Sequence, residues 1–274
     1  MESMGCTDRA NAWRFEQRLG RGGRGSAGAV RHRKRYRRLG SPAGFVVRNC
    51  RLQADRRAPD DPMPALRRGV AGLRLAVMPK VERTGVDREV LAAYDASVEV
   101  LRGLGAELRR VDLPCKFADF AASTGQIIGA EAYSILSEIV DRADLPVDPA
   151  VRLRVLSGKS LSARDYLLAL SEREKLKQQF ALALADIDAL VTPTTATPAI
   201  PLADVDQSST PAQFTRIVNL LDLCALSLPN GFTAAGLPTS LQIICKAHDE
   251  ALALRIGWAY EQATDWLERI PSVM

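Results

Sequence analysis

Hydrophobic positions between residues 72 and 111 alternate between strand-like and helix-like spacing. The apolar run at 72–77 predicts a buried strand, residues 86–104 place apolar side chains at helical spacing, and residues 108–111 predict a second strand. Gly105 is a suitable stop for the intervening helix. A strand–helix–strand unit favours parallel strands joined by a right-handed crossover.

The same alternation continues to residue 263. Ser162 is a good N-cap for a long amphipathic helix that runs to about residue 185. Asn230-Gly231 and residues 236–238 are expected to connect two strands. Alternating strands and helices imply an α/β sheet protein. The remaining elements predicted from the pattern are helices at 117–140, 153–156, 214–224 and 250–263, strands at 189–192 (ended by Pro193), 225–228 and 240–244, and a proline-rich loop at 192–201.

Residues 1–58 differ from the rest of the chain. They show no convincing periodicity, and they contain a glycine-rich stretch at 20–28 and a dense basic run at 31–38. They carry 15 basic and 4 acidic residues, a net charge of +11, whereas the other residues carry a net −6 within a total of +5. We therefore expect two parts, a disordered or poorly packed basic segment at 1–58 and a folded part at 59–274.

The amino-acid composition limits which catalytic chemistry the chain can perform and in which cellular compartment it is expected. No apolar run approaches the roughly 18 residues that span a bilayer, and the N-terminus lacks the apolar core of a secretory signal. The five cysteines are scattered without a CxxC pair, which favours reduced thiols in a cytoplasmic protein. Only His32 and His248 are present, which argues against a histidine-based metal site or a Ser-His-Asp triad. We expect neither metal nor cofactor, and no membrane association.

Three stretches in the second half carry a recognisable pattern. Residues 186–195 read DIDALVTPTT, residues 214–243 include LSLP, GF, GLP and LQI in order, and residues 249–264 form the tail. In order and spacing these resemble the amidase-signature family, over roughly the last three quarters of the chain. The resemblance implies a partial amidase-signature fold, a mixed β-sheet flanked by helices. Leu267 and Ser240 depart from the residues common in relatives.

The resemblance also implies an activity and its machinery. Family members hydrolyse the C–N bond of carboxamides, and some move ammonia onto tRNA-bound glutamate. They use a Lys–Ser–Ser set, in which lysine deprotonates a bridging serine that activates the nucleophilic serine, with backbone N–H groups as the oxyanion hole. All of these lie N-terminal to the matched region, so we expect no catalytic residue in this chain.

The family's glycine- and serine-rich motifs GGSSxGS, GTDTGGSxRxPA and GFKPT do not occur in residues 1–58. Read one base later, the codons of residues 13–19, 31–44 and 51–55 can spell all three motifs in order. On this hypothesis, the codon of Leu39 overlaps the codon of the lost nucleophilic serine in the shifted frame. The codons of Phe15 to Gln17 overlap those of the lost bridging serine. The basic segment would then be a frame-shifted signature region.

Several side chains have a functional and a structural interpretation. Thr192, Pro193, Thr194 and Thr195 form either a pocket wall or a plain strand end. Ser227 has no adjacent base, so we expect a buried structural hydroxyl. We expect Arg173 and Glu131 to pack through salt bridges. We expect Cys224 and Cys245 to behave as small residues of the core.

Three functional hypotheses follow. The first is a truncated, catalytically inactive amidase relative. The second is a working amidase or amidotransferase subunit that uses a small-molecule amide, if the correct frame or a partner restores the Lys–Ser–Ser core. The third is non-specific nucleic-acid binding by residues 1–58, since the arginine run can contact phosphates; we expect no specific nucleic-acid partner.

Overall fold

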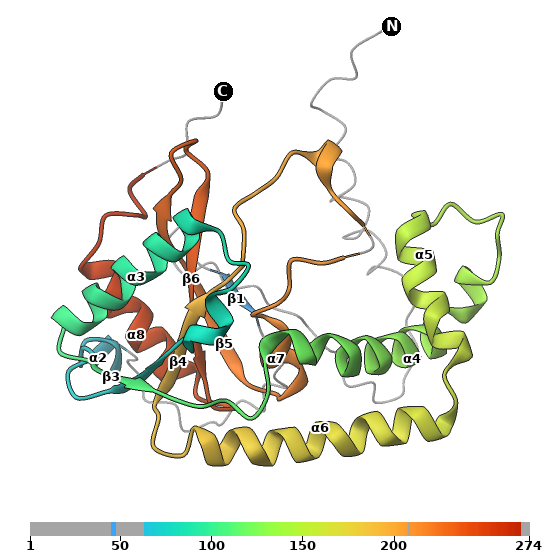
Figure 1. The fold of residues 1–274 in the computed structure, drawn as a ribbon, viewed down its shortest axis with the longest axis horizontal. Coiled ribbons are helices and arrows are strands. Elements are labelled where there is room, and N and C mark those ends of the chain that lie inside the picture. The colour runs from blue at the N-terminus through green and yellow to red at the C-terminus, as the bar shows by residue number, and fades with distance from the viewer. Residues whose placement is uncertain (1–44, 48–62, 208, 270–274) are drawn as a thin grey trace, which may run out of the picture. The chain divides into compact units, whose positions relative to one another are not determined.

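The computed structural model describes residues 45–47, 63–207 and 209–269. The sequence-predicted alternation of strands and helices is confirmed (Figure 1). The α-helices are α2 (Met63–Leu66), α3 (Arg88–Gly103), α4 (Phe120–Val140), α5 (Pro149–Leu156), α6 (Ala163–Ala183), α7 (Arg216–Leu220) and α8 (Glu250–Gln262). The strands are β1 (Phe45–Val47), β2 (Arg74–Val77), β3 (Glu107–Arg110), β4 (Ala189–Pro193), β5 (Cys224–Phe232) and β6 (Pro238–Cys245). Short 3-10 turns are Lys80–Arg83, Phe117–Asp119, Ser157–Ser160 and Leu202–Asp204.

The described strands form one mixed sheet in the order β1-β5-β6-β4-β2-β3. β2 pairs in parallel with β3 and with β4, which confirms the parallel strand–helix–strand unit. β4, β6, β5 and β1 then pair antiparallel in turn. The mixed sheet expected from the resemblance is therefore present.

Helices cover both faces of this sheet. Leu226 and Leu228 of β5 reach toward Gly257 of α8, and Ser97 of α3 hydrogen-bonds Tyr260 of α8 at 3.0 Å, so α3 and α8 share one face. Side chains alternate along a strand, so the intervening Ser227 points to the opposite face. On that face the ring of Phe214, just before α7, packs against Phe117, and Phe120 of α4 packs against Phe180 of α6.

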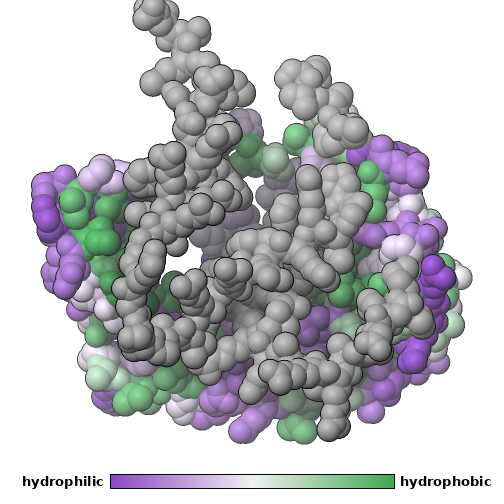
Figure 2. All heavy atoms as spheres, turned by 180° about the vertical axis from the view of Figure 1, so that it is seen from behind, coloured by the Kyte–Doolittle hydropathy of each residue, from purple (hydrophilic) through white to green (hydrophobic). Residues whose placement is uncertain are grey.

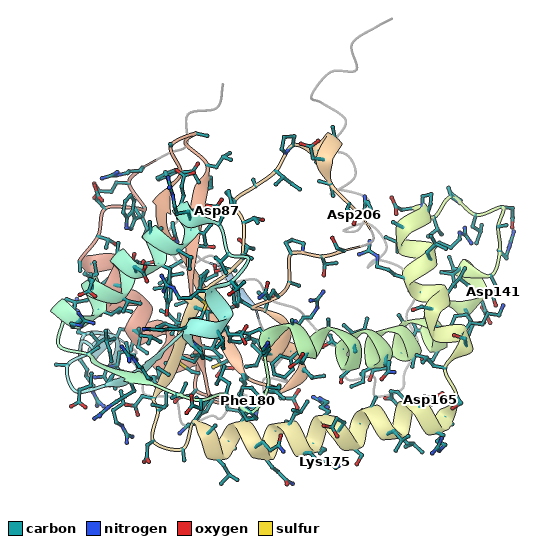
Figure 3. All side chains as sticks on the ribbon, viewed as in Figure 1. Asp87, Asp141, Asp165, Lys175, Phe180 and Asp206 are labelled. Carbon is teal, nitrogen blue, oxygen red and sulfur yellow. The ribbon has the colours of Figure 1, made fainter. Side chains whose placement is uncertain are left out.

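Local sequence signals set the helix ends. Ser162 caps α6 in a capping box, because its hydroxyl accepts from the Asp165 N–H while the Asp165 carboxylate accepts from the Ser162 N–H. Asp87 caps α3 through the N–H groups of Glu89 and Val90. Gly105 has φ +91° directly after α3, a conformation that favours glycine, so the predicted stop is confirmed. Figure 3 labels Asp87 and Asp165 at the two helix starts.

Two sequence expectations need correction. The helix predicted over residues 214–224 covers only Arg216–Leu220, and Cys224 already begins β5. Asn230-Gly231 does not connect the two strands but lies within β5, at a register shift between Pro229 and Gly231. The turn itself contains Gly236, with φ +77°.

The basic segment is described only at Phe45–Val47, a strand that the sequence pattern did not predict and that pairs with Ala225–Ser227 of β5. Residues 1–44 and 48–58 lie outside the described residues. The disorder expected for residues 1–58 therefore stays a prediction.

Several large apolar side chains of the described residues are exposed. On α4 they recur on one side of the helix, at Ile128, Ile135 and Ile139. In the space-filling view, hydrophobic residues lie among hydrophilic ones on the visible surface (Figure 2). Within the described range, no helix combines the length and apolar character needed to cross a membrane.

Candidate functional site

Four polar side chains meet on the α7-facing side of the sheet, where β4, β6 and β5 run side by side. We call Thr192, Thr194, Ser227 and Gln242 the polar row. Thr192 is the register partner of Gln242, and Gln242 is the register partner of Ser227. Direct partners project from the same face, so these side chains point the same way. The row therefore joins segments that are 33 and 50 residues apart in sequence.

One end of the polar row is sealed and the other is accessible. The Gln242 Nε2 donates to Thr192 Oγ1 at 3.1 Å and to the Phe214 carbonyl at 2.9 Å. Thr192 has no exposed surface and Gln242 has 3%. At the other end, the Thr194 and Ser227 hydroxyls lie 2.8 Å apart and are only half-buried. The Thr194–Ser227 hydroxyl pair is therefore the more exposed end of the polar row.

The loop after β4 is fixed beside this pair. The Thr194 N–H donates to the Ser240 carbonyl at 3.0 Å, which extends the β4–β6 pairing by one residue. Thr195 donates its hydroxyl proton to the Thr197 carbonyl at 2.8 Å. The Ala196 carbonyl accepts from the Asp87 N–H at 2.8 Å, which ties the loop to the start of α3. These backbone contacts hold the hydroxyl pair in place.

The chemistry available to the polar row is neutral hydrogen bonding. Within the described residues, the hydrogen bonds of its side chains reach only one another and the Phe214 carbonyl. None of these described contacts involves a lysine, histidine or carboxylate, the groups that could serve as a base for Ser227. The pair can bind an amide, because a hydroxyl both donates and accepts.

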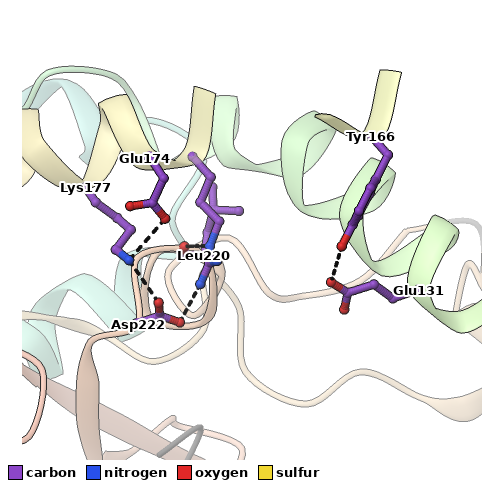
Figure 4. Close-up of polar contacts among 7 residues, drawn as sticks. Glu131, Tyr166, Glu174, Lys177, Leu220 and Asp222 are labelled. Carbon is purple, nitrogen blue, oxygen red and sulfur yellow. Dashed lines mark hydrogen bonds and ion pairs between the residues drawn. The ribbon is translucent and has the colours of Figure 1, made fainter. Parts of the chain in front are cut away.

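The other residues singled out in the sequence have structural contacts. Arg173 of α6 donates to the Leu220 carbonyl at 2.6 Å and pairs with Asp222 at 2.5 Å, which confirms salt-bridged packing (Figure 4). Glu131 is different, because it accepts from the Tyr166 hydroxyl at 3.0 Å and forms no salt bridge among the described contacts. The predicted ion pair of Glu131 is therefore not seen among the described residues.

The thiols of Cys224 and Cys245 are buried as expected, at 4% and 2% exposure. Within the described part of the chain, no three side chains of His, Cys, Asp or Glu gather as a metal site would require. The arginine run 31–38, Leu39 and residues 15–17 lie outside the described residues.

Sequence reasoning missed the role of Gln242. It was noted only as part of a motif, although a glutamine in an otherwise apolar strand run, Leu241 to Cys245, is a signal of a buried polar contact. Tyr94 was also missed. Its hydroxyl accepts from the Met78 N–H and donates to the Val191 carbonyl, which fixes α3 against β4.

A mixed sheet covered by helices on both faces is also the fold of a solved amidase structure. Residues 48–254 match the family profile described as Amidase. The chain belongs to the amidase family.

Curated relatives support this assignment. The A-type subunit of the glutamyl-tRNA(Gln) amidotransferase from Roseiflexus sp. (strain RS-1) is 30% identical over 85% of this chain and 55% of its own length. The corresponding protein from Synechococcus elongatus is 34% identical over 76% of this chain and 48% of its own length. The chain thus spans about half the length of the curated relatives it matches.

Solved structures show the same fold. A crystal structure of an amidase is 27% identical with a TM-score of 0.62, over 71% of this chain and 46% of that one. The K. lactis urea amidolyase is 26% identical with a TM-score of 0.63, over 70% of this chain and 12% of that one.

Proposed function

We propose that residues 59–274 are the C-terminal part of an amidase domain and form one wall of its amide-binding pocket, without performing hydrolysis themselves. The Thr194–Ser227 hydroxyl pair carries this proposal. It is half-buried, held by the loop after β4, and able to hydrogen-bond the C=O and NH₂ groups of a small carboxamide.

Hydrolysis requires a serine activated by a base. The side-chain hydrogen bonds of lysines in the described range go to carboxylates and to one backbone carbonyl. None goes to a serine. The family motifs that carry the Lys–Ser–Ser set are also not found in these 274 residues. This supports an inactive chain and, with it, the frame-shift hypothesis for residues 1–58.

The test compares two proteins in an ammonia-release assay with benzamide and with glutamine. We expect no release above buffer from the 274-residue chain. Protein from a gene whose frame is corrected across codons 13–62, and which also carries the family's catalytic lysine upstream of residue 1, should release ammonia if the signature has been lost by a frame slip. Release by the uncorrected chain would refute the proposal of an inactive chain.

The corrected protein then tests the pocket wall. T194A and S227A should raise KM more than they lower kcat, because they remove binding contacts and leave the nucleophile in place. T197A, at an exposed position in the same loop, is the matched control. A fall in kcat with unchanged KM would contradict the wall assignment.

The relatives' name suggests a second form of the same activity. If a partner chain restores the catalytic set, the assembly would be a working amidase or an amidotransferase. Ammonia release that appears only when a purified partner is added would identify this case.

Nucleic-acid binding by residues 1–58 is a different candidate, favoured by their net charge of +11. Binding to RNA should fall steeply with salt and disappear in a chain of residues 59–274, because charge alone drives it. Binding retained by the shorter chain would exclude this assignment.

A further inference from the structure

Two buried thiols face each other at the open end of the β5–β6 hairpin. Cys224 is the first residue of β5, Cys245 is the last of β6, and the two are direct register partners. Direct partners in antiparallel strands have Cα atoms about 4.5 or 5.5 Å apart, and both distances fall within the span of a disulfide. Neither cysteine is oxidised in this structure.

The surroundings distinguish this pair from an ordinary pair of core residues. The Cys224 thiol donates a hydrogen bond to the Lys246 carbonyl, at a distance of 3.2 Å. A hydrogen bond from the Cys245 side chain lowers the pKa of Cys224 from its ordinary value, since it stabilises the thiolate. Cys115 is the contrasting case, because burial raises its pKa to about 11 and no thiol of the described residues is paired with it.

A small hollow reaches the Cys245 side of the pair. It has a volume of about 20 Å³ and is lined by Cys245 together with Leu184, Ile187, Leu223 and Lys246. A space of this size holds roughly one water-sized molecule. Hydrogen peroxide is close to that size, whereas a peptide disulfide is far larger.

We propose that Cys224 and Cys245 form a redox modification site, which hydrogen peroxide closes to a disulfide and a dithiol reductant reopens. The Cys224 thiolate attacks one peroxide oxygen, the O–O bond breaks, and the released hydroxide takes a proton to become water. The Cys245 sulfur then attacks the sulfur of the resulting sulfenic acid, the S–S bond forms, and the departing hydroxide takes the Cys245 proton. Two thiols lose two electrons, and one peroxide becomes two waters.

The bond would join the two central strands close to the polar row. Ser227 and Gln242 are themselves register partners, each three residues along its strand from a cysteine. Closing the pair therefore restrains the strands that carry Ser227 and Gln242. It also closes a loop of 20 residues, which should raise the thermal midpoint by about 5–10 °C.

The chain offers a direct assay. Trypsin cleaves after Arg216 and Lys246, and the peptide between them contains Cys224 and Cys245 but no other cysteine. The folded 274-residue protein is treated with hydrogen peroxide, denatured, alkylated and digested. We expect this peptide to lose both alkylation sites and two hydrogens, and to recover both sites after reduction. The peptide that contains Cys115 should still be alkylated.

Controls separate a specific pair from general oxidation. In urea-unfolded protein the selectivity for this peptide should vanish. C245A should prevent the intramolecular disulfide in this peptide, whereas C115A should behave as wild type. The proposal is overturned if the folded wild-type peptide keeps two alkylation sites after peroxide, or gains oxygen without losing both thiols. This wild-type measurement holds even if C245A fails to fold.

Discussion

Gln242 has contacts that make the sealed end of the polar row rigid. Its amide donates to both Thr192 and the Phe214 carbonyl in a region with almost no solvent access. A buried polar group that loses its partner costs more than the bond itself contributes, because water cannot replace the partner. Gln242 therefore connects the sheet to the segment before α7.

We predict that Q242L lowers the free energy of unfolding by about 2 kcal/mol, since it leaves the Thr192 hydroxyl and the Phe214 carbonyl without their donor. Urea unfolding measures the change. Q178L, at an exposed position on α6, should stay within about 0.5 kcal/mol of wild type. Equal values for the two variants would contradict the role given to Gln242.

Glu82 provides a pH-dependent case. Burial raises the pKa of its carboxyl from the ordinary 4.5, although the Phe117 N–H donates to it. The folded state then holds the proton more tightly than the unfolded state, so this group costs stability as pH rises from 4.5 through the raised pKa.

We predict that E82Q is more stable than wild type at pH 7 but has no such advantage below pH 4.5, where both side chains are neutral. Glutamine keeps an oxygen for the Phe117 N–H. Urea unfolding at both pH values provides the comparison, and E138Q, on an exposed face of α4, is the control. A constant difference between E82Q and wild type at the two pH values would rule out this explanation.

At the scale of elements, α6 depends on its first turn. Its 21 residues begin with the reciprocal bonds between Ser162 and Asp165, which satisfy N–H groups that the helix cannot pair internally. Further along α6, Arg173 and Lys177 both pair with Asp222, whose φ of +55° places the chain in the left-handed region. The helix thereby positions the turn that leads into β5.

We predict that S162A destabilises the chain by about 1 kcal/mol, because one N–H of the first turn loses its acceptor. S171A, at an exposed position within the same helix, should be neutral or slightly stabilising since alanine is a better helix former. Thermal and urea unfolding of both proteins provide the measurement. A larger loss for S171A than for S162A would exclude the capping explanation.

At the scale of the whole molecule, β1 covers part of one edge of the sheet. It pairs with Ala225–Ser227 of β5, a strand of nine residues that also carries part of the polar row. An unpaired strand edge presents N–H and C=O groups that template association. The short strand therefore protects the central hairpin.

We predict that a chain of residues 48–274 aggregates more than a chain of residues 41–274, since only the longer one keeps β1. Light scattering at matched concentration tests this. Indistinguishable scattering would show that β1 does not protect the edge.

The sequence by itself determined the elements that depend on short-range periodicity and on end signals. The unit at residues 72–111, the cap at Ser162 and the stop at Gly105 were all predicted, because each is encoded by residues a few positions apart. The helix predicted to 224 failed because the apolar run around Leu220 to Leu228 suits a buried helix as well as a buried strand.

Only the tertiary structure decided which segments meet. Strand order, the pairing of β1 with β5, and the registers that place Thr194 beside Ser227 and Cys224 beside Cys245 depend on packing between segments far apart in the chain. A strand's alternation shows which residues share a face, but not which strand will lie next to it. The polar row and the thiol pair therefore exist only in the folded sheet.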